Sequence, residues 1–170
     1  MWRQGLVRNF WLTLTCVYLS GCGLSPMYTG GGDGAVARGL AAVDVAPIEG
    51  KAGWLVRNAL RDRLAESGGD APPPRYLLQI QLDDNLEGLG LLNDDTIGRE
   101  RRTLRARYQL IDNTTGTAIL DASAGSDAGI DVVSSEYATI VAEQTALENL
   151  ARVVAERIVT RIALQLRQGS

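Results

Sequence analysis

Three segments in the middle of the 170-residue chain alternate apolar and polar residues, and this alternation limits the possible folds more than any other pattern. The segments are 75–82, 99–111 and 117–124, and the turn sequence Asp112-Asn113-Thr114-Thr115-Gly116 separates the last two. A period of two places apolar side chains on one face of a strand and polar side chains on the other. We therefore expect consecutive antiparallel strands with one buried face and one solvent-exposed face.

Two amphipathic helices are expected to cover the buried face of this sheet. The first, over 51–67, has apolar residues at helical spacing and ends at Gly68-Gly69, and the second runs over 135–168 with a continuous apolar stripe from Ile140 to Ile162. A short strand over 40–46 precedes them. The sequence thus predicts an α+β fold, a two-layer sandwich of two helices on a mostly antiparallel four-stranded sheet, in the order β-α-β-β-β-α.

The first 21 residues have the layout of a secretory signal. Arg3 and Arg8 precede the apolar run 10–19, and Ser20-Gly21 supplies small residues directly ahead of Cys22. The run has about half of the roughly 20 apolar residues that a membrane-spanning helix needs. We expect residues 1–21 to be a lipoprotein signal peptide, 22–39 an acylated N-terminus and flexible tether, and 40–170 a single domain.

The four residues Leu19-Ser20-Gly21-Cys22 resemble the lipobox of bacterial lipoproteins. In those proteins the chain is cut before the cysteine, whose thiol is then diacylated. Two or three acyl chains make a stable anchor, whereas one chain binds a membrane only marginally. Gly23, in place of an aspartate, follows the cysteine, which is compatible with export to the outer membrane. We expect Cys22 to be the lipid attachment site and the protein to face the periplasm from the outer membrane.

The composition argues against an enzyme and against a metal site. The chain has no histidine, and its two cysteines are Cys16, which leaves with the signal, and Cys22. Clusters of metal ligands and catalysis by Cys/His or Ser/His pairs need those residue types. The carboxylate pairs Asp83-Asp84 and Asp94-Asp95 lie in a turn-like stretch with nothing to desolvate them. We therefore predict a protein that is not an enzyme and has no cofactor apart from the covalent lipid.

Four arginines form the first candidate binding feature. They fall on one solvent-facing side of the strand 99–111 and are called the arginine ridge: Arg99, Arg101, Arg105 and Arg107. Guanidinium groups suit phosphates and carboxylates, which makes the ridge a candidate anion site. The alternative is a solvated sheet face that its neighbours neutralise. If the 113–116 turn sets the register, Asp121 lies near Arg107 and Asp127 near Arg101, and half of the ridge is self-paired.

The connection over 83–98 is the second candidate. Acidic residues flank an apolar centre made of four leucines: Leu86, Leu89, Leu91 and Leu92. A hairpin tip of this type, if exposed, would insert into a partner or among acyl chains. Alternatively, the leucines fold back over the end of the core or simply extend the strands.

Several short motifs occur in the order and spacing of a known family. They are the opening Cys22-Gly23-Leu24-Ser25-Pro26-Met27-Tyr28, the helix start LVRNAL at 55–60, YLL at 76–78, the region 96–116, and the helix with Leu150-Ala151 and Glu156-Arg157-Ile158. Together they resemble the lipopolysaccharide-assembly lipoproteins LptE, also called RlpB, in their alphaproteobacterial form. Leu24 and Met27 depart from the usual opening, and Val56 departs from the usual helix start.

The resemblance implies a concrete role. Members of this family have two helices on a four-stranded sheet, plug the outer-membrane β-barrel LptD, help it assemble, and bind lipopolysaccharide on its way to the outer leaflet. The implied partners are LptD, lipopolysaccharide and, through the acyl anchor, the inner leaflet of the outer membrane, but no nucleic acid. Since lipopolysaccharide carries phosphates and acidic sugars, the resemblance favours the arginine ridge as its site. The alternative is another outer-membrane lipoprotein, an accessory subunit of a lipid transporter or a secretin pilot.

Overall fold

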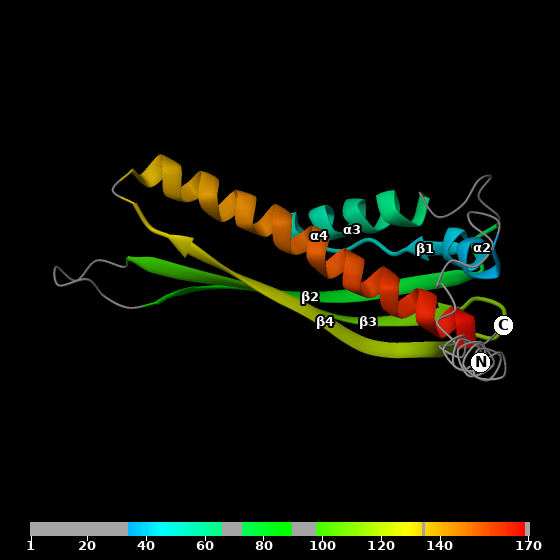
Figure 1. Cartoon of the computed structure of the whole chain (residues 1–170). Helices are drawn as coiled ribbons and strands as arrows, with labels where there is room; N and C mark the ends of the chain where they lie inside the picture. The colour runs from blue at the N-terminus through cyan, green and yellow to red at the C-terminus, as the bar shows by residue number, and fades with distance from the viewer. Residues whose placement is uncertain (1–33, 66–72, 90–97, 134, 169–170) are drawn as a thin grey trace, which may run out of the picture.

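The computed structural model describes residues 34–65, 73–89, 98–133 and 135–168, which form one sheet with helices on one of its faces (Figure 1). The elements in chain order are α2 (Ala35–Ala41), β1 (Val43–Val45), α3 (Gly50–Ala65), β2 (Tyr76–Gly88), β3 (Arg99–Asp112), β4 (Thr117–Asp131) and α4 (Glu136–Gln168). The predicted α+β class is confirmed, with one more helix, α2, ahead of the expected elements.

The sheet has the strand order β1-β2-β3-β4. β1 is parallel to β2, whereas β2, β3 and β4 form two long antiparallel ladders, so the predicted mostly antiparallel sheet is confirmed. A bulge between Leu110 and Ile111 shifts the register of β3 against β4. β2 and β4 both run further than the alternation predicted, to Gly88 and to Asp131.

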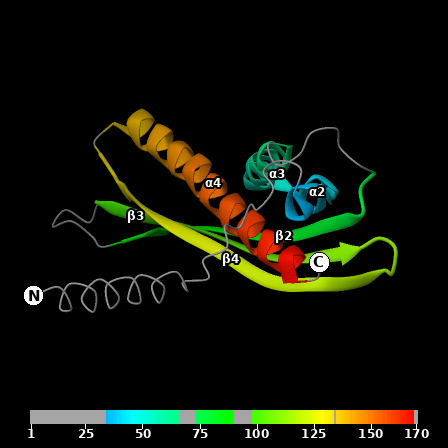
Figure 2. The same ribbon diagram turned by 45° about the vertical axis from the view of Figure 1, so that its right-hand side comes forward.

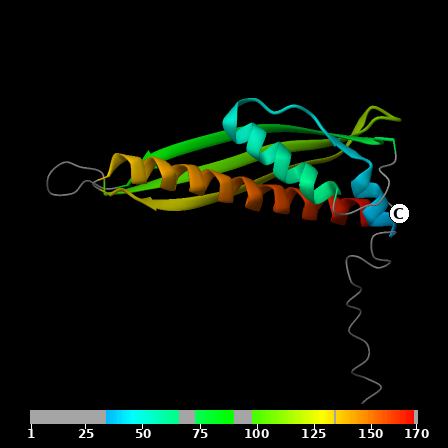
Figure 3. The same ribbon diagram turned by 90° about the horizontal axis from the view of Figure 1, so that it is seen from above.

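The core lies between the sheet and the helices. Alternate residues of β3 are buried against the helices, namely Leu104, Ala106, Tyr108 and Leu110. α3 contributes Val56, Leu60 and Leu64, and α4 contributes a stripe that includes Val154 and Ile158. Viewed from above, α4 runs along the length of the sheet with α3 beside it (Figure 3). The opposite face of the sheet is left uncovered by the described helices (Figure 2).

The start of the domain differs from the expectation. Residues 35–41, assigned above to the tether and to the first strand, form helix α2, and β1 covers only 43–45. The segment AVARGLA is rich in good helix formers, and its buried residues Ala37 and Leu40 are three positions apart, on one helix face. α2 packs against the end of α4, where Gly39 lies close to Leu166. Residues 1–33, with the expected signal, Cys22 and most of the tether, lie outside the described residues.

None of the described helices is both long enough and apolar enough to cross a membrane.

Candidate functional site

The arginine ridge lies on the uncovered face of the sheet. Its four members are exposed and alternate along β3 with the buried Leu104, Ala106 and Tyr108. This is the arrangement that the period-two pattern predicted. The ridge therefore runs down the middle of a wide, solvent-facing surface, because β3 is flanked by β2 on one side and β4 on the other.

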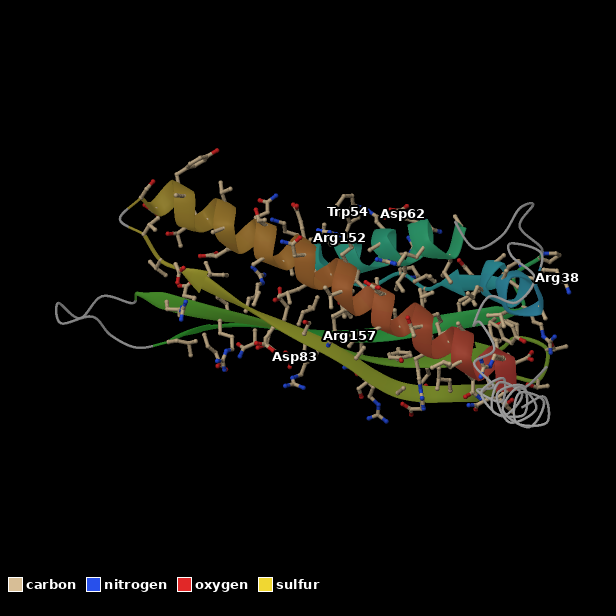
Figure 4. The ribbon with its side chains drawn as sticks, viewed as in Figure 1. Arg38, Trp54, Asp62, Asp83, Arg152 and Arg157 are labelled. Carbon is tan, nitrogen blue, oxygen red and sulfur yellow. The ribbon has the colours of Figure 1, made fainter. Side chains whose placement is uncertain are left out.

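Acidic residues of β2 lie directly across from two members of the ridge. Asp83 is the cross-strand partner of Arg105, and Glu87 is that of Arg101. Figure 4 shows Asp83 on the side of the sheet away from the helices. No ion pair closes across either of these pairs within the described residues, although opposite charges at such positions attract each other.

Acidic residues of β4 pair with the other two members. Arg99 Nε lies 3.1 Å from Asp131 Oδ1, and Arg107 Nη2 lies 3.3 Å from Asp121 Oδ2. Gln109 also donates a hydrogen bond of 2.9 Å to the Asp121 carboxylate. The hydrogen bond from Gln109, followed by that from Arg107, lowers the pKa of Asp121 below its ordinary value. Half of the arginine ridge is therefore already engaged with the protein's own carboxylates.

The predicted register was partly right. The contact between Asp121 and Arg107 is confirmed. Asp127 lies opposite Thr103, two cross-strand pairs away from Arg101, and the structure records no ion pair between it and Arg101. The pair formed by Asp131 was missed because β4 extends seven residues beyond the predicted end at 124.

Arg101 and Arg105 share a setting that separates them from the rest of the ridge. On β4 each faces a glycine, Gly129 opposite Arg101 and Gly125 opposite Arg105, so the position directly across from each carries no side chain. Around Arg105 the surface is hollowed over about 440 Å³. The hollow is lined by side chains that include Gln81, Asp83, Arg107 and Ser123. These two guanidinium groups are the members of the ridge best placed to meet an external anion.

A fifth arginine of the same strand points the other way. Arg102 faces the helices, where it donates two hydrogen bonds to Asp84, of 2.8 and 2.7 Å, and one to the backbone oxygen of Glu143 in α4. The side chains of Arg102 and Asp84 are only 17% and 24% exposed. The hydrogen bonds to Asp84 raise the pKa of Arg102.

The role of Asp84 corrects the sequence analysis. Asp83 and Asp84 were assigned to a turn-like stretch with nothing to desolvate them, but both lie inside β2, and Asp84 turns toward α4. The signal was present in the sequence, since Asp84 continues the even-numbered series of Tyr76, Leu78, Ile80 and Leu82. Nearby, one carboxylate oxygen of Glu100 is buried without a hydrogen-bond partner in the structure.

The four leucines of the 83–98 connection are placed only in part. Leu86 belongs to β2 and is 40% exposed, so for this residue the interpretation as a strand extension is correct. Leu89 is partly buried directly after the strand. Leu91 and Leu92 lie outside the described residues, and the idea of an inserting tip therefore stays a prediction.

Exposed apolar side chains gather near the start of α4. Tyr137, Ile140 and Val141 are exposed there, as is Val133 after β4. The apolar stripe of the sequence placed Ile140 in the core, but it is 52% exposed, because the first turns of α4 rise away from the sheet (Figure 1). Trp54, 63% exposed, lies apart from this group on the outer side of α3 (Figure 4).

Comparison with known families identifies the chain. The family model described as LptE, lipopolysaccharide-assembly, matches residues 40–162. The chain belongs to the LptE family. Membership implies a role in lipopolysaccharide assembly, and the family is one of non-enzymatic lipoproteins, consistent with the outer membrane.

Solved structures of low sequence identity share the fold of this LptE protein. A protein from Caulobacter crescentus described as a lipoprotein is 24% identical with a TM-score of 0.66, covering 81% of this chain and 98% of its own. A minor lipoprotein from Acinetobacter baumannii is 14% identical with a TM-score of 0.55, and the match covers 72% of this chain and 90% of the Acinetobacter chain. The rare lipoprotein B of Shewanella oneidensis is 12% identical with a TM-score of 0.50, and the match covers 74% of this chain and 95% of the Shewanella chain. None of the curated protein sequences matches this chain.

Proposed function

We propose that this LptE protein is an outer-membrane lipoprotein of the alphaproteobacterial form, anchored through Cys22 and facing the periplasm. In this role it plugs the LptD barrel, helps that barrel assemble, and binds lipopolysaccharide during delivery to the outer leaflet. Family membership over residues 40–162 supports the setting. The observation that carries the binding step is the pair Arg101 and Arg105, exposed on an open sheet face and each opposite a glycine of β4.

The proposed contact uses the chemistry of guanidinium groups. A planar guanidinium donates two parallel hydrogen bonds to a phosphate or carboxylate, which are the anionic groups of lipopolysaccharide. Arg105 lies four positions after Arg101, which places the two groups about 13 Å apart along the strand. A ligand with several anionic groups is therefore held at two points. Arg99 and Arg107 contribute less, because each is bound to an aspartate of β4.

Two double variants test this assignment. Arg101→Gln with Arg105→Gln is expected to weaken binding of purified lipopolysaccharide at least about tenfold, since each charged hydrogen bond contributes about 1.5–3 kcal/mol. Arg99→Gln with Arg107→Gln removes the same charge from the same strand and is expected to have a smaller effect. Binding is measured by titration, with circular dichroism as the check on folding. Equal losses in the two double variants would contradict the assignment.

The setting is tested on the native protein. Mass spectrometry is expected to find the chain cut ahead of Cys22 and acylated on it, and a Cys22→Ser variant is expected to stay uncut. A tag on the protein is expected to recover LptD in a one-to-one ratio from solubilised outer membrane. Recovery of a lipid transporter or a secretin in place of LptD would favour the alternative roles named above.

A further inference from the structure

The two outer strands of the sheet differ greatly in length. β1 has three residues and pairs only with Tyr76, Leu77 and Leu78 of β2, which itself has thirteen residues. The remaining residues of β2, 79–88, pair with no described strand on their outer side, and the far end of β2 continues past the start of α3 (Figure 3). Most of this edge of the sheet is therefore open.

The direction of the backbone groups follows from the bonds at the two ends of β2. The oxygen of Arg75 and the N–H of Leu89 bond to residues on the β3 side, and the N–H of Tyr76 bonds to Ala42 on the β1 side. Because bonding direction alternates along a strand, odd positions face β3 and even positions face outward. The outward groups beyond β1 belong to Ile80, Leu82, Asp84, Leu86 and Gly88, and no described residue bonds to them.

The opposite edge of the sheet, formed by β4, has two features that hinder the addition of a strand. β4 carries a bulge in its pairing with β3, and Arg157 of α4 donates a hydrogen bond to the backbone oxygen of Gly125. Figure 4 shows Arg157 reaching from the helix toward the strand. Bulges and covering side chains are devices by which proteins prevent strands from adding to an edge. The outer edge of 80–88 has no bulge, no proline and no such cover among the described residues.

The charges on β2 argue against a second copy of the chain as the added strand. Asp83, Asp84 and Glu87 lie within 80–88, and antiparallel pairing of this stretch with itself brings acid against acid. Like charges placed across two strands are destabilising. Asp83 and Glu87 face the uncovered side of the sheet, where they favour an incoming strand with basic side chains.

We propose that the free edge of β2, residues 80–88, accepts an extended segment of LptD as a fifth strand, with basic side chains against Asp83 and Glu87. The inference rests on the proposed function, which supplies the partner. Because a closed barrel has no free strand edge, the added segment belongs to a loop or extension of LptD rather than to its barrel wall. The backbone of β2 supplies the bonds, and the acids select the partner.

A proline at an outward position tests the backbone bonds. In Leu86→Pro the lost N–H is one that points to the free edge, so the ladder with β3 is kept. The matched variant Leu86→Ala keeps the N–H and removes the apolar side chain. Each tagged variant is co-expressed with LptD of the same organism, and the recovered LptD is quantified. We expect at least a tenfold loss for Leu86→Pro and near wild-type recovery for Leu86→Ala.

The other outcomes overturn the inference. Equal recovery with both variants excludes a backbone role, and equal loss with both indicates a side-chain contact. If the wild-type protein itself recovers no LptD, the proposed function fails and the inference fails with it. The charge preference has its own variant: Glu87→Lys is expected to lower recovery several-fold, and unchanged recovery excludes a basic segment.

Hydrogen exchange provides a measurement that does not depend on the folding of a variant. In the wild-type protein alone, the amides of Ile80, Leu82, Asp84, Leu86 and Gly88 are expected to exchange much faster than the odd-numbered amides between them, which bond to β3. In the purified complex with LptD, the even-numbered amides are expected to slow at least tenfold. Unchanged exchange at these positions in the complex would overturn the proposal.

Discussion

Arg102 and Arg105 lie three residues apart on β3 and have opposite environments. Arg102 is enclosed between the sheet and α4, where its guanidinium satisfies both Asp84 and a backbone oxygen of the helix. Arg105 faces solvent and makes no ion pair with any described residue. The alternation of the strand therefore gives one arginine a structural role and leaves the other free for a ligand.

The two arginines are expected to differ in their effect on stability. Arg102→Met leaves Asp84 without its partner in a site that is largely shielded from water, and we expect the free energy of unfolding to fall by about 1–3 kcal/mol. Arg105→Met is the control from the same strand, with an expected change within about 0.5 kcal/mol. Urea denaturation measures both. Equal effects would show that the Arg102 site contributes no more than a surface residue.

Asp112 gives the protein a dependence on pH. This buried carboxylate accepts hydrogen bonds from the side chain and backbone N–H of Thr114, and then from Arg75, and together they lower its pKa. A lowered pKa means that the folded state favours the ionised carboxylate. The stability that this carboxylate gives the folded protein is complete above its unfolded pKa of about 3.9. This stability is lost as the pH falls through the lower pKa of the folded state.

Asp112→Asn is therefore expected to destabilise the protein at pH 7 and to have a smaller effect at pH 3. The physical reason is that acid neutralises the wild-type carboxyl and so removes the difference between the two proteins. Thermal unfolding followed by circular dichroism at both values gives the comparison. A loss of stability in Asp112→Asn that is larger at pH 3 than at pH 7 would show that the ionised carboxylate is not the stabilising form.

Among the elements, α3 contains Gly53, a position where neighbouring backbone leaves no room for a side chain. Alanine is favoured over glycine inside a helix by about 1 kcal/mol. However, a Cβ atom on Gly53 would lie 2.6 Å from the backbone oxygen of Ile48, which is closer than atoms approach without displacement. The segment that leads from β1 into α3 therefore packs directly on the helix backbone.

We expect Gly53→Ala to lower the free energy of unfolding, whereas helix propensity alone would raise it. Gly39→Ala in α2 is the comparison, because its Cβ would meet only the end of the flexible Leu166 side chain, at 3.0 Å. Denaturant melts of both variants measure the change in the free energy of unfolding. Stabilisation by Gly53→Ala would mean that the contact with Ile48 relaxes at no cost.

The elements also differ in how well the sequence predicts them. β3 and α4 are long and strictly periodic, so their type and their buried faces follow from the pattern. α2 was missed because a seven-residue helix has only two buried positions, and alternation continues across its end into β1. The far end of β4 was missed because alanine, serine and glycine carry little apolar contrast.

The same reasoning separates what could be predicted of the candidate site from what could not. The exposure of the arginine ridge follows from period two alone. Which of its members are engaged depends on a bulge and on the full length of β4, and neither has a clear sequence signal here. The outward position of Ile140 depends on the angle at which α4 leaves the sheet, which no local pattern specifies.

At the scale of the whole molecule, α2 joins the beginning of the described chain to its end. Leu40 of α2 is fully buried in the same core as Ile162 of α4. A chain of residues 34–170 is therefore expected to fold, whereas a chain of residues 42–170 loses about 2–5 kcal/mol of stability with the burial of Leu40. Urea denaturation of the two truncated chains tests this. Equal stability would show that α2 contributes nothing to the stability of the domain.

The packing of α2 on α4 also has a mechanical consequence. Any pull on the chain ahead of residue 34 reaches the domain through this short helix and passes directly to the last turns of α4. The load enters at the end of the molecule where α2 lies, far from the C-terminal end of β2 (Figure 1). Tension would thus strip α2 from the helical layer first, and the three long strands would remain paired.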